Sequence, residues 1–166
     1  MRFEVKIFFF VGWCFALNVL VSDKLKKSVV DNAVDFFKGE GDYVDVVSLD
    51  VGDFVFGDCV VFSFYHLADF VRAVKNRSVF NRAEIQSWDF KYHFVVVVST
   101  LRERRVYFNK LVYSGWKGGY FDGDHFIGAV AGLNTFTRVI CVDYEDLAFR
   151  FMRIHAGKCL SIEYSL

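Results

Sequence analysis

The segment Tyr92–Val98 reads YHFVVVV and carries the strongest strand pattern of the chain. A charged turn follows it, and residues 105–109 (RVYFN) repeat the pattern, so residues 92–112 are predicted to form an antiparallel hairpin. Further along, residues 139–144 read VICVDY and are predicted to open a helix that runs to about Arg153. These two segments carry the main strand and helix predictions for the second half of the chain.

Helical and strand patterns surround these two segments. Residues 24–38 place apolar side chains at helical spacing and are closed by Gly39 and Gly41. Residues 81–88 are predicted to form a loop. The remaining predictions are strands at 43–49, 54–56 and 159–164 and a helix at 66–74. Together they predict a single α+β domain over residues 23–166, with an antiparallel sheet packed against helices.

The first 22 residues allow two interpretations. Arg2 and Lys6 precede an apolar run over residues 7–21, the layout of a secretory signal peptide. The run is shorter than a membrane span, and it equally suits a buried N-terminal element of the domain. The first interpretation predicts a secreted protein and the second a cytoplasmic one, and the sequence leaves both open.

The charge balance argues against nucleic acid as a partner. The 166 residues carry a formal net charge of +0, with both signs interspersed, so no overall basic field would attract a phosphate backbone. The four cysteines show no ligand-like spacing with histidine, which argues against a zinc site. An acidic stretch over residues 42–58 lacks the calcium-loop pattern and is predicted to be a solvated face.

Three residues suggest a nucleophilic site. Cys141 would stand at the start of a helix, where the helix dipole lowers the pKa of a thiol. His93 heads a predicted strand and would accept the thiol proton, while Asn109 on the returning strand would orient the imidazole. Backbone N–H groups at the helix start would hold an oxyanion. The alternative is a small buried cysteine and an ordinary surface histidine.

The order of these motifs resembles a known family. A Gly52-Asp53 strand, a helix, the His93 strand and a late cysteine are similar to circularly permuted papain-like proteins, the NlpC/P60-related branch with its YiiX-like and lecithin:retinol acyltransferase relatives. The resemblance implies a thiol hydrolase or acyltransferase that acts on an amide or ester bond of a peptide or an acyl lipid. It assigns Cys141, His93 and Asn109 to the site and implies no metal or organic cofactor.

A second hypothesis is a non-catalytic accessory protein, viral or secreted, that uses the same fold to bind a host protein. Val95 replaces the glycine usual after the histidine, and Val142-Asp143 replaces the common Ser-Glu, which favours this hypothesis. The glycine-rich loop over residues 115–125 carries three aromatic residues, which are the candidate anchors for a substrate or a partner: Trp116, Tyr120 and Phe121. Contact with a membrane and a purely structural role also stay open.

Overall fold

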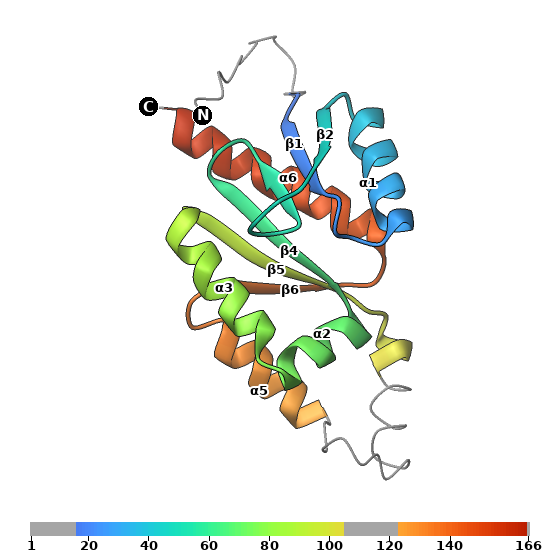
Figure 1. Cartoon of the computed structure of the whole chain (residues 1–166), viewed down its shortest axis with the longest axis vertical. Coiled ribbons are helices and arrows are strands. Elements are labelled where there is room, and N and C mark those ends of the chain that lie inside the picture. The colour runs from blue at the N-terminus through green and yellow to red at the C-terminus, as the bar shows by residue number, and fades with distance from the viewer. Residues whose placement is uncertain (1–15, 105–122, 166) are drawn as a thin grey trace.

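A six-stranded sheet lies between two layers of helices (Figure 1). The computed structural model describes residues 16–104 and 123–165. Along the sheet the strands follow the order β2 (Tyr43–Val47), β1 (Asn18–Ser22), β3 (Phe54–Phe56), β4 (Val60–His66), β5 (Tyr92–Val98) and β6 (Arg138–Val142).

The sheet is mixed and mostly parallel. β3 runs antiparallel to both of its neighbours, β1 and β4, whereas the pairs β1–β2, β4–β5 and β5–β6 are parallel. The predicted antiparallel sheet is therefore wrong, and the architecture is α/β. The permuted papain-like arrangement is not confirmed. The continuous apolar run of β5, buried on both faces, is typical of a parallel strand, whereas antiparallel strands more often alternate between apolar and polar residues.

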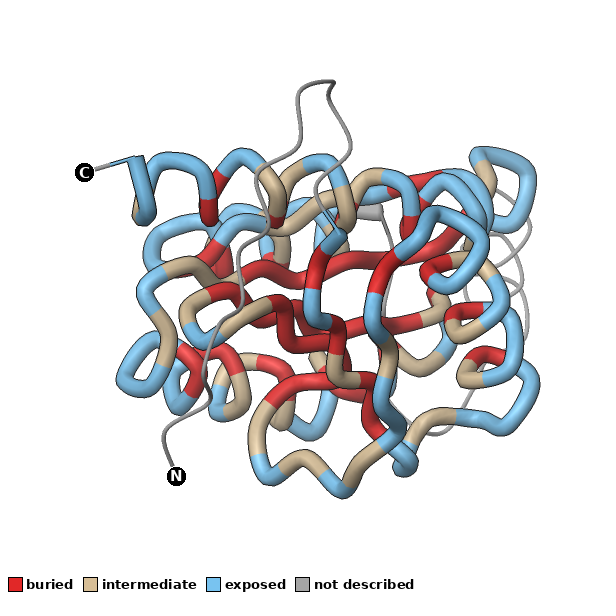
Figure 2. The backbone as a smooth tube through the Cα atoms, turned by 90° about the horizontal axis from the view of Figure 1, so that it is seen from above, coloured by how far each residue is buried: buried red, intermediate tan, exposed pale blue. Residues whose placement is uncertain are grey.

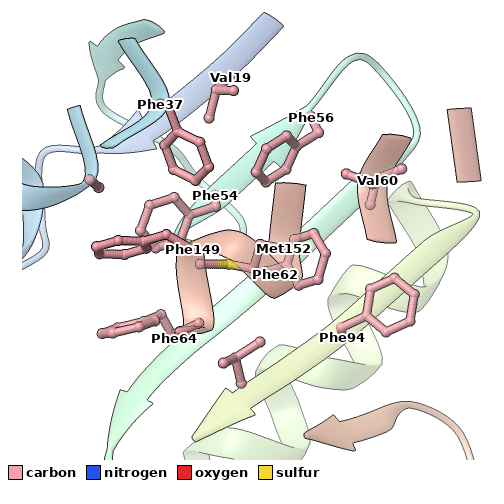
Figure 3. Packing of buried hydrophobic residues seen from close by; sticks show 14 of the residues in the cluster. Val19, Phe37, Phe54, Phe56, Val60, Phe62, Phe64, Phe94, Phe149 and Met152 are labelled. Atoms are coloured by element: carbon pink, nitrogen blue, oxygen red, sulfur yellow. The ribbon is translucent and has the colours of Figure 1, made fainter. Parts of the chain in front are cut away.

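The first helical layer covers one face of the sheet with aromatic side chains. It consists of α1 (Lys27–Gly39) and α6 (Glu145–Tyr164). Phe37 of α1 and Phe149 of α6 are fully buried and lie with ring centroids 5.8 Å apart. Strand residues complete this aromatic cluster, which Figure 3 shows: Phe54, Phe56, Phe62, Phe64 and Phe94. Such edge-to-face and tilted ring pairs add to the free energy gained by burying apolar area.

The second layer covers the opposite face and buries a smaller cluster of residues. It consists of α2 (Leu67–Lys75), α3 (Ser78–Asp89) and α5 (Gly123–Leu133). Alternate residues of β5, Val95 and Val97, pack against this layer, while their neighbours face the aromatic cluster. Seen from above, the central strands form the buried interior, and exposed residues follow the outer turns of the helices (Figure 2). None of the described helices is long and apolar enough to span a membrane.

Residues before 23 contribute directly to the sheet. β1 lies between β2 and β3, and its Val19 and Val21 are buried in the aromatic cluster. A chain cut after residue 22 would therefore lack an interior strand. Residues 1–15 lie outside the described part of the chain.

Three local predictions are wrong. The hairpin over residues 92–112 does not form, because β4 and β6 occupy both edges of β5 and residues 101–104 are helical. Cys141 lies inside β6, since the β-branched residues around it favour a strand, and α6 begins only at Glu145. The predicted strand at 159–164 is the last part of α6.

The predicted loop over residues 81–88 is also wrong, because it lies inside α3. The buried residues of this helix are Val79, Ala83 and Gln86, which recur at helical spacing. One of the three is polar, so hydrophobicity alone does not reveal the pattern.

We predict that Phe37→Ala lowers the free energy of unfolding by about 3–5 kcal/mol, because it opens a cavity at the centre of the aromatic cluster. Urea unfolding followed by circular dichroism measures the change. Trp88→Ala is the matched control, since Trp88 is 72% exposed and its loss should cost no more than about 0.5 kcal/mol. Equal losses for the two variants would contradict the described packing.

Candidate functional site

A cleft of about 490 Å³ opens where β1 and β4 end. These two strands run in the same direction, so their carboxyl ends meet at one edge of the sheet. Open α/β sheets bind their ligands outside the carboxyl ends of strands. We call this hollow the carboxyl-edge cleft; its polar lining includes Lys24, Lys26, Asp53, Tyr65, His66 and Arg82.

Asp53 is the central buried group of the carboxyl-edge cleft. Its Oδ2 accepts the backbone N–H of Phe64 at 2.8 Å, and its Oδ1 accepts from the Arg82 guanidinium at 3.1 Å. The Asp53 side chain is only 8% exposed, so the ion pair is well shielded from water. The two contacts connect the loop before β3 with β4 and α3. The predicted solvated acidic face is therefore wrong at this position, because a buried carboxylate requires partners and here it has them.

Arg82 also contacts Tyr65. Its second guanidinium nitrogen donates to the Tyr65 hydroxyl at 3.4 Å, and the guanidinium carbon lies 5.7 Å from the centre of the Tyr65 ring. Burial raises the pKa of Tyr65, and the positive charge of Arg82 offsets part of that effect. Tyr65 is therefore a neutral hydroxyl at physiological pH, and it is a hydrogen-bonding group of the cleft wall.

Gly52 fixes the direction in which Asp53 enters the site. Its φ is +82°, and a Cβ built on it would lie 2.2 Å from Cγ2 of Val61. Both the left-handed backbone and the contact with β4 therefore require glycine here. Below this turn, Gln86 donates to the Ser63 hydroxyl, so a polar pair lies in the interior beside Asp53.

The carboxyl-edge cleft is lined by three cationic side chains, Lys24, Lys26 and Arg82, and by three acidic ones, Asp50, Asp53 and Asp69. Lys26 lies 3.6 Å and Arg72 3.4 Å from the carboxylate of Asp69, so one acidic side chain serves two cations. Lys24 donates through Nζ to the backbone carbonyl of Leu49 and has no carboxylate partner in the described part of the chain. Exposed ion pairs of this kind are weak, so an incoming anion can replace the carboxylate.

A histidine and a glutamate form a hydrogen-bonded pair beside the rim of the same cleft. Nε2 of His66, at the end of β4, lies 2.8 Å from Oε1 of Glu145, the first residue of α6. The other oxygen of Glu145 accepts from the amide of Asn32 on α1. These contacts join three elements beside the cleft and hold its wall in place.

The donor set of the cleft does not suit a divalent cation. Such ions are held in proteins by several carboxylate or other oxygen ligands at short distances. Both oxygens of Asp53 already accept hydrogen bonds, and the positive Arg82 lies directly beside them. Within residues 16–104 and 123–165, no group of three or more His, Cys, Asp and Glu side chains could hold a metal ion.

The structure does not bring His93 and Cys141 together. Cys141 is paired in register with Val97, four residues along β5 from His93, which corresponds to about 13 Å. His93 instead contacts Thr137, with Nδ1 3.1 Å from Oγ1. Burial raises the pKa of the Cys141 thiol, and nearby Arg104 lowers it by less. The pKa of Cys141, which lies in a strand, is therefore raised, whereas a position at the start of a helix would lower it.

The other predicted site residues are not placed. Asn109, Trp116, Tyr120 and Phe121 fall outside the described residues. In the other direction, sequence reasoning missed the pair between Asp53 and Arg82. The Gly52-Asp53 motif is visible in the sequence, but residues 81–88 are predicted to form a loop. The sequence therefore does not indicate that Arg82 lies on a helix that faces Asp53.

Comparison with known proteins identifies the fold. No family model and no curated protein matches the chain. Two solved structures of XPF from Aeropyrum pernix match over 86% of the chain, with TM-scores of 0.64 and 0.62 and 16% identity, and the second of them is a complex with DNA. The chain spans 61% and 66% of those two chains.

These matches correct the sequence-based assignment. The resemblance to permuted papain-like and NlpC/P60-related proteins is wrong, because the fold is that of XPF. The thiol hydrolase or acyltransferase, its peptide or acyl-lipid substrate, and the viral or secreted accessory protein that binds a host protein therefore lose their support. The exclusion of nucleic acid is overturned as well, since one matched XPF structure contains DNA. That exclusion rested on the net charge of the whole chain, which says nothing about local surfaces.

We predict that Cys141 reacts slowly with iodoacetamide near neutral pH and that His93→Ala leaves its rate unchanged. Because the pKa of Cys141 is raised, the fraction of thiolate becomes large only above the pH at which an ordinary thiol ionises. The alkylation rate follows the fraction of thiolate. Peptide mass spectrometry over a pH series measures the rate. Cys59, whose pKa burial raises to about 11, is the internal reference and should react more slowly still. Fast labelling of Cys141 that depends on His93 would contradict the described geometry.

Proposed function

We propose that this chain is a DNA-binding domain whose carboxyl-edge cleft contacts the phosphate backbone. The observation that carries the proposal is the shared fold with XPF over 86% of the chain, in a match that includes a DNA complex. The position of the cleft supports it, because ligands of α/β sheets bind at the carboxyl ends of strands.

The rim supplies the attraction for DNA. Lys26 and Arg72 both pair with the carboxylate of Asp69, and Lys24, whose ammonium bonds only to a backbone carbonyl, lies in the same cleft lining. When a phosphate replaces this carboxylate, the cations exchange two weak exposed ion pairs for contacts that also release counterions from DNA. Contacts of this kind position a protein on DNA without reading its sequence. The proposed binding is therefore insensitive to sequence and strongly dependent on salt.

The cleft supports binding and not metal-assisted cleavage. Hydrolysis of a phosphodiester with divalent cations uses carboxylates that hold the metal against the phosphate. The carboxylate of Asp53 is instead held by Arg82 and by the Phe64 N–H. In the proposal Asp53 and Arg82 shape the cleft wall, and the rim cations hold the DNA.

We predict that the double variant Lys24→Ala/Lys26→Ala binds a fluorescein-labelled DNA duplex about tenfold more weakly than wild type at low salt. Losing two phosphate contacts should also reduce the slope of log affinity against log salt by about 2. Fluorescence anisotropy at several salt concentrations measures both. Lys38→Ala is the matched control, since Lys38 is an exposed lysine at the far end of α1.

Two results would count against the proposal. If the wild type binds no duplex, or if the double variant binds as tightly as Lys38→Ala, the cleft is not the DNA contact. The same samples, incubated with Mg²⁺ or Mn²⁺ and run on a gel, should show intact DNA and unchanged affinity after EDTA is added. Cutting that depends on the metal would overturn the assignment of binding without cleavage.

A further inference from the structure

A second hollow lies at the opposite edge of the sheet and has a different character. It measures about 590 Å³ and is bounded by the starts of β5 and β6 and by the second half of α6. We call it the amino-edge groove. Its lining contains no acidic side chain and includes Tyr92, His93, Asn134, Phe136, Arg138 and Lys158.

The amino-edge groove carries uncompensated positive charge. Arg138 and Lys158 are exposed, and neither forms an ion pair with any residue in the described part of the chain. The third cation, Lys91, is already bound to Glu163. His155 lies in the same lining, and its pKa is lowered by burial and then by the charges of Arg138 and Lys158. The groove therefore presents two cations to an anion and a neutral imidazole beside them.

Hydrogen-bonding groups are also left available. The Thr137 hydroxyl donates to the His93 carbonyl, so its oxygen accepts the hydrogen of His93 Nδ1. Nε2 of His93 is then an acceptor, since burial lowers the pKa of His93 and keeps the ring neutral. Asn134 accepts the backbone N–H of Val139 through Oδ1, which leaves its NH₂ group as a donor. One acceptor and one amide donor match the edge of a nucleobase.

An exposed ring completes the set. Phe136 lies in the groove lining with 41% of its surface exposed, and the half-buried Tyr92 lies in the same lining. Single-stranded nucleic acids bind to surfaces that combine cations for the backbone with aromatic faces for the bases. In a duplex the bases are stacked and paired, so an exposed ring of this kind reaches them only in a single strand.

We propose that the amino-edge groove binds single-stranded nucleic acid, with Arg138 and Lys158 on the phosphates and Phe136 stacked against a base. This inference rests on the proposed function, since it names a second DNA contact of the same domain. Two contacts at opposite edges of one sheet would let the domain hold a duplex in the carboxyl-edge cleft and a single strand in the amino-edge groove.

The test measures binding of a fluorescein-labelled ten-nucleotide thymidine oligomer by anisotropy. The double variant Arg138→Gln/Lys158→Gln should bind it at least tenfold more weakly, with the salt slope reduced by about 1.4. Phe136→Ala should weaken binding about tenfold with an unchanged salt slope, because a stacking contact releases no counterions. Thermal melting checks that each variant stays folded.

The controls separate this inference from the proposed function. Lys38→Gln should bind the oligomer like wild type, and the Arg138/Lys158 double variant should keep most of its affinity for duplex. If both groove variants bind the oligomer like wild type, or if free thymidine monophosphate competes as well as the oligomer does, the groove is not a strand site and duplex binding through the cleft stands. If wild type binds neither duplex nor oligomer, both proposals fail.

Discussion

The buried pair between Asp53 and Arg82 is the interaction on which the organisation of this domain depends. Asp53 accepts one bond from the backbone of β4 and one from α3, and Gly52 provides the only backbone geometry that brings it there. Removing Arg82 would leave the buried carboxylate of Asp53 without its cation, which is far more costly than losing an exposed pair. The pair therefore sets how α3 packs on the sheet, and it also defines the floor of the carboxyl-edge cleft.

The same pair decides what chemistry the carboxyl-edge cleft can support. A carboxylate that already accepts from a guanidinium and an N–H group has little capacity left for a metal ion. In the proposed function, the exposed cations around it make the contacts with DNA. Zero net charge is compatible with this arrangement, because charges can be distributed unevenly: the amino-edge groove is lined by cations and by no acidic side chain, and Lys24 in the carboxyl-edge cleft has no carboxylate partner among the described residues.

Much of the local structure could be predicted from the sequence. α1, β3, α2 and β5 lie close to the predicted ranges, because their apolar residues follow helical or strand spacing. α3 was missed because Gln86 occupies one of its buried positions and bonds to Ser63 there. The direction of β5 was predicted wrongly although its unbroken valine run, buried on both faces, is typical of a parallel strand, and β6 was predicted as the start of a helix.

The candidate site was harder to predict than the fold. Asp53 and Arg82 are 29 positions apart, and their contact arises only from the packing of α3 against β4. Cys141 and His93 were predicted to form a site because both are reactive residue types. The parallel register of β5 and β6 separates them by four residues along neighbouring strands. The net charge led to a wrong exclusion of nucleic acid in a similar way, because a sum over the whole chain does not show where positive charges cluster on the surface.

The most direct test of a DNA-binding domain with this cleft is to follow the backbone amides of the ¹⁵N-labelled protein by NMR during titration with a short DNA duplex. The account predicts that the largest shift changes occur at Lys24, Lys26 and the residues around Gly52 and Arg82, with saturation that weakens as salt increases. Changes confined to a surface away from the carboxyl-edge cleft, or no changes at all, would contradict it.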